Sequence, residues 1–579
     1  MRKPILALLF AIVAACGLLF NPLGHTAPAY ASVRKLTALA GGVIDFRLSP
    51  NGQWVLFRLL RNDTVSLYSV PIQGGPARRL ASPILSYARL APMIRTMYAI
   101  SPDSQRVLYF GMPSPAATPT PPAGGAYVEH PGFGLYSVPI DGSTASSLIV
   151  DDPNIHAFGF SPDAQRAIYA TGTGTTNAPG EIYRFDLYSK PIAGGTAERL
   201  NIDLATGQSV AFDRFSILPS GYVVYGLGAL SYTYPYGPSM GLVDLYRVPI
   251  AGPSSQSVKL NPCGPVHILV NRYVVSQDGQ RIVLNGSDCD GGGVLRSLPI
   301  TGGAATRLSP AGDTRIPQTT FITEDQRFVV YTLPHTVNQQ TVRDLYIAPL
   351  TGPSSAIHLV QSGSPSGVDP QLVGDAPNGD WLAFSSGTAL YVAARTWASD
   401  SPQLVTTNHV ASSYALISAD SRYLIYQETG GMLRSLQLGS SSSSSLSLGL
   451  PATDYSRLYR RAGANRILIR NHADGHLYTA PAGGPAAALI RVSHTPVDYY
   501  SGPTITPDGT AVVYISDEDG QLYVTDIDAA YTAPTPVFQL PQGCGNSPSP
   551  ITTTGPTRIP FATEYPIFIP GLQQCYPEP

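Results

Sequence analysis

Short runs of β-branched, aromatic and aliphatic residues recur along the chain, and each run is bounded by turn residues. Residues 160–200 show the pattern: a turn at 161–165, an apolar run at 166–170, and a second run at 186–192 that is followed by Gly-Gly at 194–195 and Arg-Leu at 199–200. Proline at the second turn position presets φ, aspartate bonds its own backbone, and Gly-Gly reverses the chain. The intervening runs suit half-buried strands, so the unit predicts four short strands.

The turn that joins the first two strands recurs in ten copies, one of them degraded. Successive copies are roughly 42 to 60 residues apart, which is the length of a four-stranded propeller blade with variable loops. A second motif, Leu-Tyr followed by Pro, marks the third strand, and the proline ends it because proline cannot donate to a ladder. The turns begin at Ser49, Ser101, Ser161, Leu218, Ser276, Thr323, Ala376, Ser418, Arg461 and Thr506.

These motifs carry a family resemblance. Ser-Pro-Asp-Gly before an apolar strand, followed by Leu-Tyr, Gly-Gly and Arg-Leu, resembles the TolB-type, WD40-like propeller repeat over about residues 40–540. The resemblance implies an all-β fold, a β-propeller of about ten four-stranded blades, closed as one wide ring or as two adjoining rings. It implies little about function, because such blades are interchangeable scaffold units.

The first residues have the pattern of an export signal. Arg2 and Lys3 precede an apolar core at 4–20, and Ala-Tyr-Ala at 29–31 predicts cleavage before Ser32. A lipoprotein with an acylated Cys16 is the alternative, because Val-Ala-Ala-Cys resembles a lipoprotein box. We therefore expect a signal peptide at 1–31, repeats at 34–540 and a Pro/Thr-rich tail at 541–579, with the protein secreted, periplasmic or on the cell surface.

Two further features bear on the organisation of the chain. The serine tract at 440–445 is either a loop between two strands or a joint between two rings. Export permits disulfides, and sequence order favours pairing neighbours among the four remaining cysteines, although three connectivities exist. The disulfide candidates are Cys263, Cys289, Cys544 and Cys575.

One face of the predicted ring is the candidate binding face. The turns between first and second strands are short and uniform, whereas several connections between second and third strands are long. Unequal loops on one face of a repeat array indicate binding. The long connections are 112–130, 171–180, 227–241 and 334–341.

Within these loops, Tyr232, Tyr234 and Tyr236 offer flat, amphipathic contact area. His130 and Phe133, at the end of the longest connection, are further candidate binding residues. The competing interpretation is that the tyrosines pack on neighbouring loops.

The sequence motifs that could indicate catalysis or metal binding are less specific than the repeat motifs. Residues 237–241 spell a nucleophile elbow, but a strand and not a helix is expected to follow. The Asp-Gly sequences at 288–291 and 517–520 are typical of hairpin tips more than of calcium loops. His472 and His476 flank another such turn. We therefore predict no catalytic residue, metal site or cofactor.

The net charge of −2 gives no sign of a nucleic-acid partner. The sequence favours an exported, non-catalytic scaffold that binds a protein or cell-envelope partner through its long-loop face. Two alternatives stay open: a propeller enzyme similar to polysaccharide lyases, with a metal on the ring axis, and a structural protein of a surface layer or appendage.

Overall fold

The computed structural model describes most of residues 33–527, and the predicted signal peptide and C-terminal tail lie outside the described residues. The described segments are 33–62, 64–84, 97–111, 133–173, 184–211, 215–233, 237–261, 273–287, 293–313, 315, 317, 320–363, 369–394, 402–409, 415–430, 432–439, 446–447, 457–460, 465–484 and 489–527.

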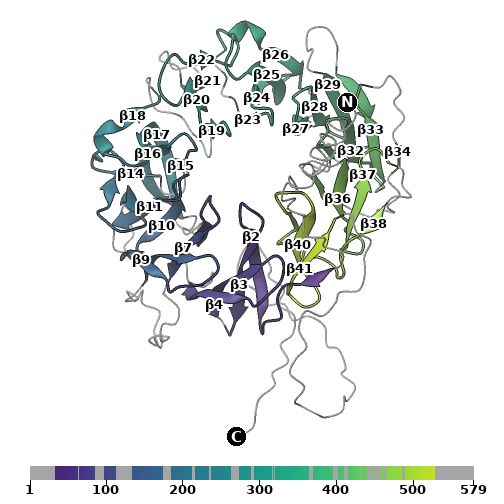
Figure 1. Cartoon of the computed structure of the whole chain (residues 1–579). Coiled ribbons are helices and arrows are strands. Elements are labelled where there is room, and N and C mark those ends of the chain that lie inside the picture. Colours follow the sequence, from purple (N-terminus) through teal and green to yellow (C-terminus); the bar gives the residue numbers. More distant parts are fainter. Residues whose placement is uncertain are drawn as a thin grey trace, which may run out of the picture.

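These residues form ten small antiparallel sheets that are arranged side by side in a single ring (Figure 1). Nine of the sheets have four described strands and the fourth has five. The fold is thus a ten-bladed β-propeller, which confirms the predicted all-β class and repeat number. Of the two closures left open by the sequence, the structure has the single ring. In blades five and six, the first strands β19 (Tyr273–Val275) and β23 (Thr320–Ile322) lie nearer the ring centre than the fourth strands β22 (Thr306–Arg307) and β26 (His358–Gln361) (Figure 1).

The first three blades follow one another along the chain. Blade one contains β2 (Gly42–Leu48), β3 (Trp54–Arg61), β4 (Thr64–Pro71) and β5 (Arg78–Ile84). Blade two contains β6 (Tyr98–Ile100), β7 (Arg106–Gly111), β8 (Gly134–Pro139) and β9 (Ser147–Val150). Blade three contains β10 (Ile155–Phe160), β11 (Arg166–Thr173), β12 (Arg184–Pro191) and β13 (Glu198–Arg199).

The next three blades include the longest strands. Blade four contains β14 (Gln208–Val210), β15 (Ser216–Ile217), β16 (Tyr222–Thr233), β17 (Gly237–Pro249) and β18 (Val258–Lys259). Blade five contains β19 (Tyr273–Val275), β20 (Arg281–Ser287), β21 (Gly293–Pro299) and β22 (Thr306–Arg307). Blade six contains β23 (Thr320–Ile322), β24 (Phe328–Val337), β25 (Gln340–Pro349) and β26 (His358–Gln361).

Blades seven to ten complete the ring. Blade seven contains β27 (Pro370–Asp375), β28 (Trp381–Ser386), β29 (Ala389–Ala394) and β30 (Gln403–Thr406). Blade eight contains β31 (Ala415–Ile417), β32 (Tyr423–Gln427), β33 (Leu433–Gln437) and β34 (Leu446–Ser447). Blade nine contains β35 (Arg457–Arg460), β36 (Arg466–Arg470), β37 (Leu477–Pro481) and β38 (Ile490–Arg491). Blade ten contains β39 (Thr504–Ile505), β40 (Ala511–Ile515), β41 (Leu522–Asp526) and β1 (Arg34–Lys35).

Blade ten closes the ring because its outer strand comes from the other end of the repeat region. In β1, Arg34 pairs with Val524 and Lys35 pairs with Tyr523. The backbone N–H of Leu36 donates to the Leu522 carbonyl at 2.7 Å. The last blade therefore holds both ends of the ring in one sheet.

Helical structure is minimal in the described residues. Two single-turn 3₁₀ helices, η1 (Ser254–Gln256) and η2 (Ser354–Ala356), follow the third strands of blades four and six. This agrees with the predicted all-β class. Neither turn has the length or apolar character that crossing a bilayer requires, and the described residues include no other helix.

The core lies between neighbouring blades, because each sheet packs a face against the next. Leu187 of blade three, for example, shares a buried cluster with Val223 and Tyr225 of blade four. Leu36 and Val513 of blade ten share another with Phe57 of blade one. Since the same kind of cluster joins the last blade to the first, the packing continues around the ring.

Aromatic pairs brace the middle of seven blades. A second-strand Phe or Tyr stacks on a third-strand aromatic with ring centroids 5.3 to 5.7 Å apart, which adds to the area that these rings bury. The pairs are Phe57–Tyr68, Tyr109–Tyr136, Tyr169–Tyr188, Tyr225–Tyr246, Tyr331–Tyr346, Phe384–Tyr391 and Tyr514–Tyr523.

The strands on either side of the serine tract, β33 and β34, pair with each other in the sheet of blade eight. The tract itself, 440–445, lies outside the described residues, and its interpretation as a loop between two strands stays a prediction.

Candidate functional site

The two faces of the ring differ in what they carry. One face, here called the turn face, has the turns between first and second strands together with those between third and fourth strands. The two kinds of turn are tied to each other, as where Ile72 N–H donates to the Gln53 carbonyl at 2.9 Å. The opposite face, here called the hairpin face, has the connections between second and third strands and those that lead to the next blade.

The turn face is uniform because each turn satisfies its own polar groups. In the turn that begins at Ser161, the hydroxyl donates to Asp163 Oδ1 and accepts from Arg166 N–H at 2.8 Å. Asp163 Oδ1 also accepts from Gln165 N–H at 3.0 Å. Ala164 has a positive φ of 59° at the position that glycine occupies in other copies.

Neighbouring turns also bind one another. Asn51 N–H donates to Ser104 Oγ at 3.0 Å, and Asn378 N–H donates to Ser421 Oγ at 3.1 Å. At the closure, a side chain on Gly52 would lie 3.0 Å from a ring carbon of Pro507. In the part of the chain that the structure describes, neighbouring turns of the turn face are therefore tied to one another at several places around the ring.

A shallow pocket lies on the turn face between blades one and two. It is lined by Trp54, Pro71, Pro76, Arg78, Asp141 and Ser143. Trp54, Pro71 and Arg78 are terminal residues of β3, β4 and β5, and the other three lie in connections between third and fourth strands. The pocket is therefore formed by the same repeated scaffold.

The hairpin face is unequal from blade to blade. Two of the four connections that we expected to be long loops, 227–241 and 334–341, are extensions of paired strands. β16 and β17 pair as far as Thr233 opposite Gly237, and β24 and β25 pair as far as Val337 opposite Gln340. The other two, 112–130 and 171–180, lie largely outside the described residues.

The blade-six hairpin ends in a tight turn. Asn338 and Gln339 have positive φ angles of 50° and 66°, as a two-residue mirror-image turn requires. Both residues are exposed. The hairpin therefore presents a narrow, well-defined tip to the solvent.

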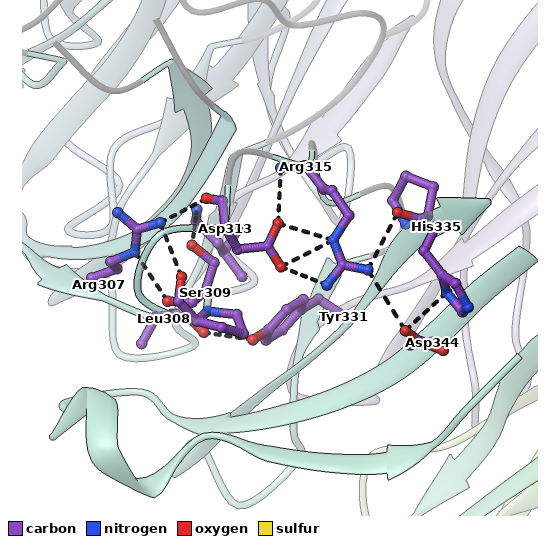
Figure 2. Close-up of polar contacts among 11 residues, drawn as sticks. Arg307, Leu308, Ser309, Asp313, Arg315, Tyr331, His335 and Asp344 are labelled. Atoms are coloured by element: carbon purple, nitrogen blue, oxygen red, sulfur yellow. Dashed lines mark hydrogen bonds and ion pairs between the residues drawn. The ribbon is translucent and has the colours of Figure 1, made fainter. Parts of the chain in front are cut away.

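A polar cluster holds the base of this hairpin (Figure 2). Arg315, from the connection between blades five and six, donates to Asp313 through Nε at 2.9 Å and through Nη2 at 2.6 Å. Its Nη1 lies 3.6 Å from Asp344 Oδ2 of β25 and donates to the Pro334 carbonyl of β24 at 3.4 Å. Arg315 thus joins the connection to both strands of the hairpin.

The charges of the cluster are balanced. Burial alone would raise the pKa of Asp313, but the hydrogen bonds and charge of Arg315 outweigh it and lower that pKa. Asp313 in turn raises the pKa of Arg315. His335 Nδ1 contacts Asp344 Oδ2 at 3.0 Å, while Asp344 Oδ1 accepts from Gly363 N–H at 2.9 Å.

The same connection is fixed on its other side by Arg307 of β22. Its guanidinium donates to the carbonyls of Ser309, Pro310 and Asp313 at 3.1, 3.0 and 2.8 Å. Tyr331 donates to the Leu308 carbonyl at 2.6 Å (Figure 2). These contacts make the cluster a support that positions the hairpin.

The sequence-predicted binding residues are placed as follows. Tyr232 lies in β16 opposite Pro238 of β17. Phe133 is buried and packs against Phe110 with ring centroids 6.0 Å apart. Tyr234, Tyr236 and His130, like Cys263, Cys289, Cys544 and Cys575, lie outside the described residues. The binding role of these residues and the disulfides stay predictions.

The doubtful motifs have local explanations. A strand and not a helix follows residues 237–241, as expected, and these residues are themselves part of that strand, β17, so they do not form an elbow between a strand and a helix. Residues 517–520 form the hairpin turn between β40 and β41, where Gly520 N–H donates to the Ser516 carbonyl at 3.0 Å. The second Asp-Gly sequence, 288–291, lies within a connection of blade five that is not among the described residues.

The two histidines of blade nine meet different partners. His476 Nδ1 lies 3.1 Å from Ser493 Oγ, and the His472 ring meets Tyr499. In the part of the chain that the structure describes, no group of three His, Cys, Asp or Glu side chains is arranged to hold a metal ion.

The structure adds two residues that the sequence reasoning missed. Tyr499 and Tyr500, between blades nine and ten, are exposed on the hairpin face. Their signal in the sequence was an Asp-Tyr-Tyr-Ser segment, 498–501, in a connection where neither tyrosine belongs to a strand.

No family model matches the chain, and no curated protein sequence matches it. Among solved structures, a eukaryotic initiation factor is 12% identical, with 72% of this chain and 90% of that chain covered and a TM-score of 0.38. The propeller domain of the Trilobed protease from Pyrococcus furiosus is 14% identical, with coverages of 64% and 98% and a TM-score of 0.28. TolB from Acinetobacter baumannii is 14% identical, with coverages of 56% and 64% and a TM-score of 0.24.

The match to TolB therefore spans a little under two-thirds of that protein's length. These likenesses concern the fold: the chain is a β-propeller that resembles TolB and the propeller domains of peptidases at low identity.

Proposed function

We propose that the protein is an exported, non-catalytic scaffold that holds a protein or cell-envelope partner on its hairpin face. The observation that carries this proposal is the contrast between the two faces. The turns of the turn face bind one another and have nearly the same form, whereas the hairpins of the other face differ in length. Repeat proteins diversify the face that binds.

The rigidity of one hairpin on this face supports binding. The blade-six hairpin is stiffened by the Asp313–Arg315 pair and by the contacts of Arg315 with its two strands. A rigid projection loses little conformational entropy when a partner binds. Export is supported by the charged and apolar segments at the start of the sequence.

Site-specific photo-crosslinking tests the binding face. A photoreactive residue replaces Asn338 at the tip of the blade-six hairpin, and in a matched variant it replaces Asn378 on the turn face. Both side chains are exposed. We expect crosslinks to one partner in intact cells from position 338 and none from position 378. Crosslinks that arise at 378 alone, or equally at both positions, would contradict the proposal.

Export is tested separately by mass spectrometry of the mature protein. We expect an amino terminus at Ser32 in the fraction outside the cytoplasmic membrane, because the small-x-small site precedes it. A lipid-modified Cys16 would place the protein on the membrane as a lipoprotein. An unprocessed protein in the cytoplasm would contradict export.

A further inference from the structure

An exposed aromatic site lies where blades nine and ten meet on the hairpin face. Tyr499 and Tyr500 belong to the connection from β38 to β39, and they are 44% and 50% exposed. The tyrosines of the stacked pairs elsewhere in the ring are by contrast buried or half-buried. Large exposed aromatic rings side by side are typical of binding sites, because they offer much apolar area for few rotatable bonds.

The ring of Tyr499 is held by its neighbours. The Arg470 guanidinium lies 5.1 Å from the ring centroid, and the His472 ring meets it at 5.8 Å and 68°. Tyr500 stands nearly perpendicular to it, with centroids 5.4 Å apart at 86°. Arg470 itself is buried and donates to the Val497 carbonyl at 2.8 Å.

The backbone beneath the two tyrosines is fixed as well. Asp498 accepts from Tyr500 N–H at 3.2 Å and from Ser501 Oγ at 3.1 Å. Val497 N–H donates to the Gly475 carbonyl of blade nine, and Asp498 N–H donates to the Ile515 carbonyl of blade ten, both at 2.9 Å. The site is therefore preorganised by both blades, which lowers the entropic cost of binding.

The charges around the site narrow the class of ligand. Asp517 N–H donates to the Pro496 carbonyl at 2.9 Å, which places Asp517 beside the segment that carries Asp498. Partial burial, and then the Asp498 charge, raise the pKa of Asp517, while Arg470 opposes them. This pair of carboxylates repels an anion. Arg470 already lies against the Tyr499 ring and repels a second cation there. A neutral ligand meets neither penalty.

We propose that Tyr499 and Tyr500 form a contact site for a neutral polysaccharide. The C–H face of a pyranose packs on a tyrosine ring, and its hydroxyls donate to the carboxylates of Asp498 and Asp517. The perpendicular rings allow one sugar to stack on one tyrosine while its edge meets the other. This inference rests on the proposed function, since it names the partner chemistry of one site on the hairpin face.

Affinity electrophoresis of the full chain tests the site. The gels contain a neutral glucan, mannan, xylan or galactan, and polygalacturonate and chitosan serve as the anionic and cationic probes. We expect retardation by at least one neutral polymer, and a loss of affinity of about tenfold or more in Tyr499→Ala and Tyr500→Ala. Tyr499→Phe and Tyr500→Phe keep the ring and stay within about twofold of the wild type. Leu359→Ala, at a 50% exposed leucine of blade six, is the control without effect.

A second measurement does not depend on substitutions. Nitration of the native protein by tetranitromethane modifies exposed tyrosines, and the retarding polysaccharide is expected to protect Tyr499 and Tyr500. Failure of all four neutral polymers to retard the protein would overturn the proposal, as would stronger retardation by a charged polymer or nitration without protection. If any of these results is obtained together with crosslinks from position 338, the polysaccharide site is rejected and the proposed function as a binding scaffold is retained.

Discussion

At the scale of single residues, the repeated turn works through one hydroxyl and one carboxylate. Ser161 and Ser276 each donate to an aspartate two residues on and accept a backbone N–H five residues on. These hydrogen bonds lower the pKa of Asp163 and Asp278 from the ordinary value of 3.8. The ionised carboxylate is therefore part of the folded turn.

The first prediction concerns the stability of the protein at low pH. A carboxylate whose pKa is lower in the folded than in the unfolded state stabilises the fold above the unfolded pKa, and this contribution is lost as the pH falls through the folded pKa. In the double variant Asp163→Asn/Asp278→Asn, we expect the urea midpoint to fall less than in the wild type between about pH 5 and about pH 2. If the urea midpoint depended on pH equally in the two proteins, these two carboxylates would not contribute to the pH dependence of stability.

The second prediction concerns the polar cluster of blade six. Asp313→Ala removes the partner of Arg315, whose charge then lies half-buried without its main acceptor. We expect a loss of about 2 kcal/mol in unfolding free energy from the urea midpoint. Asp203, 93% exposed and paired with Arg199, is the matched control, and Asp203→Ala should cost less than about 0.5 kcal/mol. Similar losses of unfolding free energy in both variants would mean that the polar cluster stabilises the fold no more than an exposed ion pair does.

At the scale of elements, a side chain just after the fourth strand accepts a hydrogen bond from a backbone N–H of the third strand in several blades. Asn201 Oδ1 accepts from Leu187 N–H at 2.7 Å, and Asn261 does the same for Leu245 at 2.8 Å. In blade nine the acceptor is Ser493 Oγ, which binds Leu477 N–H at 2.9 Å. The small polar residue after Arg-Leu in the repeat thus has a physical role, since it satisfies a buried N–H.

The third prediction concerns the blade-six hairpin. Gln339 has a positive φ, which glycine adopts without strain. We expect Gln339→Gly to stabilise the hairpin by about 0.5 kcal/mol and to slow amide exchange in β24 and β25. Gln339→Val should speed that exchange because a β-branched residue is strained there. Exchange in the β16–β17 hairpin serves as the internal reference and should not change.

The elements that could be predicted from sequence are those fixed by local contacts. The turns rest on hydrogen bonds between residues two and five apart, so Ser161 and Asp163 were sufficient to place them. Long loops were expected at 227–241 and 334–341, and Gly228 and Pro334 in these segments are residue types that mark turns. Cross-strand pairing overrides these signals, since Pro334 lies opposite Arg343 and Gly228 opposite Leu242.

The aromatic site was missed for a related reason. Tyr499 and Arg470 are far apart in the sequence, and the connection and hairpin that carry them come together only when blades nine and ten pack. The order of residues does not show which connections meet on one face. A pair of tyrosines beside an aspartate in a connection was the one local signal.

At the scale of the whole molecule, closure depends on a strand that is far from its partners in the sequence. Thr37 Oγ1 accepts a hydrogen bond from Leu522 N–H at 2.9 Å, as Asn201 Oδ1 does from Leu187 N–H within blade three. Lys35-Leu36-Thr37 is therefore a copy of the Arg-Leu motif, placed before the first turn of the repeats. Because this copy pairs with β41 at the other end of the repeats, it was the sequence signal for a single closed ring.

The fourth prediction tests that closure. Leu36 is buried in the cluster that joins blade ten to blade one, next to Phe57 and Val513. Leu36→Asp places a charge among apolar side chains, so β1 must leave the sheet or the carboxylate must lose its hydration. We expect a loss of about 3 kcal/mol or more in unfolding free energy and a larger radius of gyration in solution scattering, because the ring opens at this seam.

The control for the closure variant lies on the outer strand of another blade. Leu359 belongs to β26 and is 50% exposed, so Leu359→Asp adds the same charge where water already reaches it. This variant should keep the wild-type midpoint and radius of gyration. If Leu36→Asp also kept both values, the stacked cores between blades would be sufficient to hold the ring, and β1 would only complete an edge. If its midpoint fell without a change in radius, the seam would be weakened but closed, and the damage would be confined to blade ten.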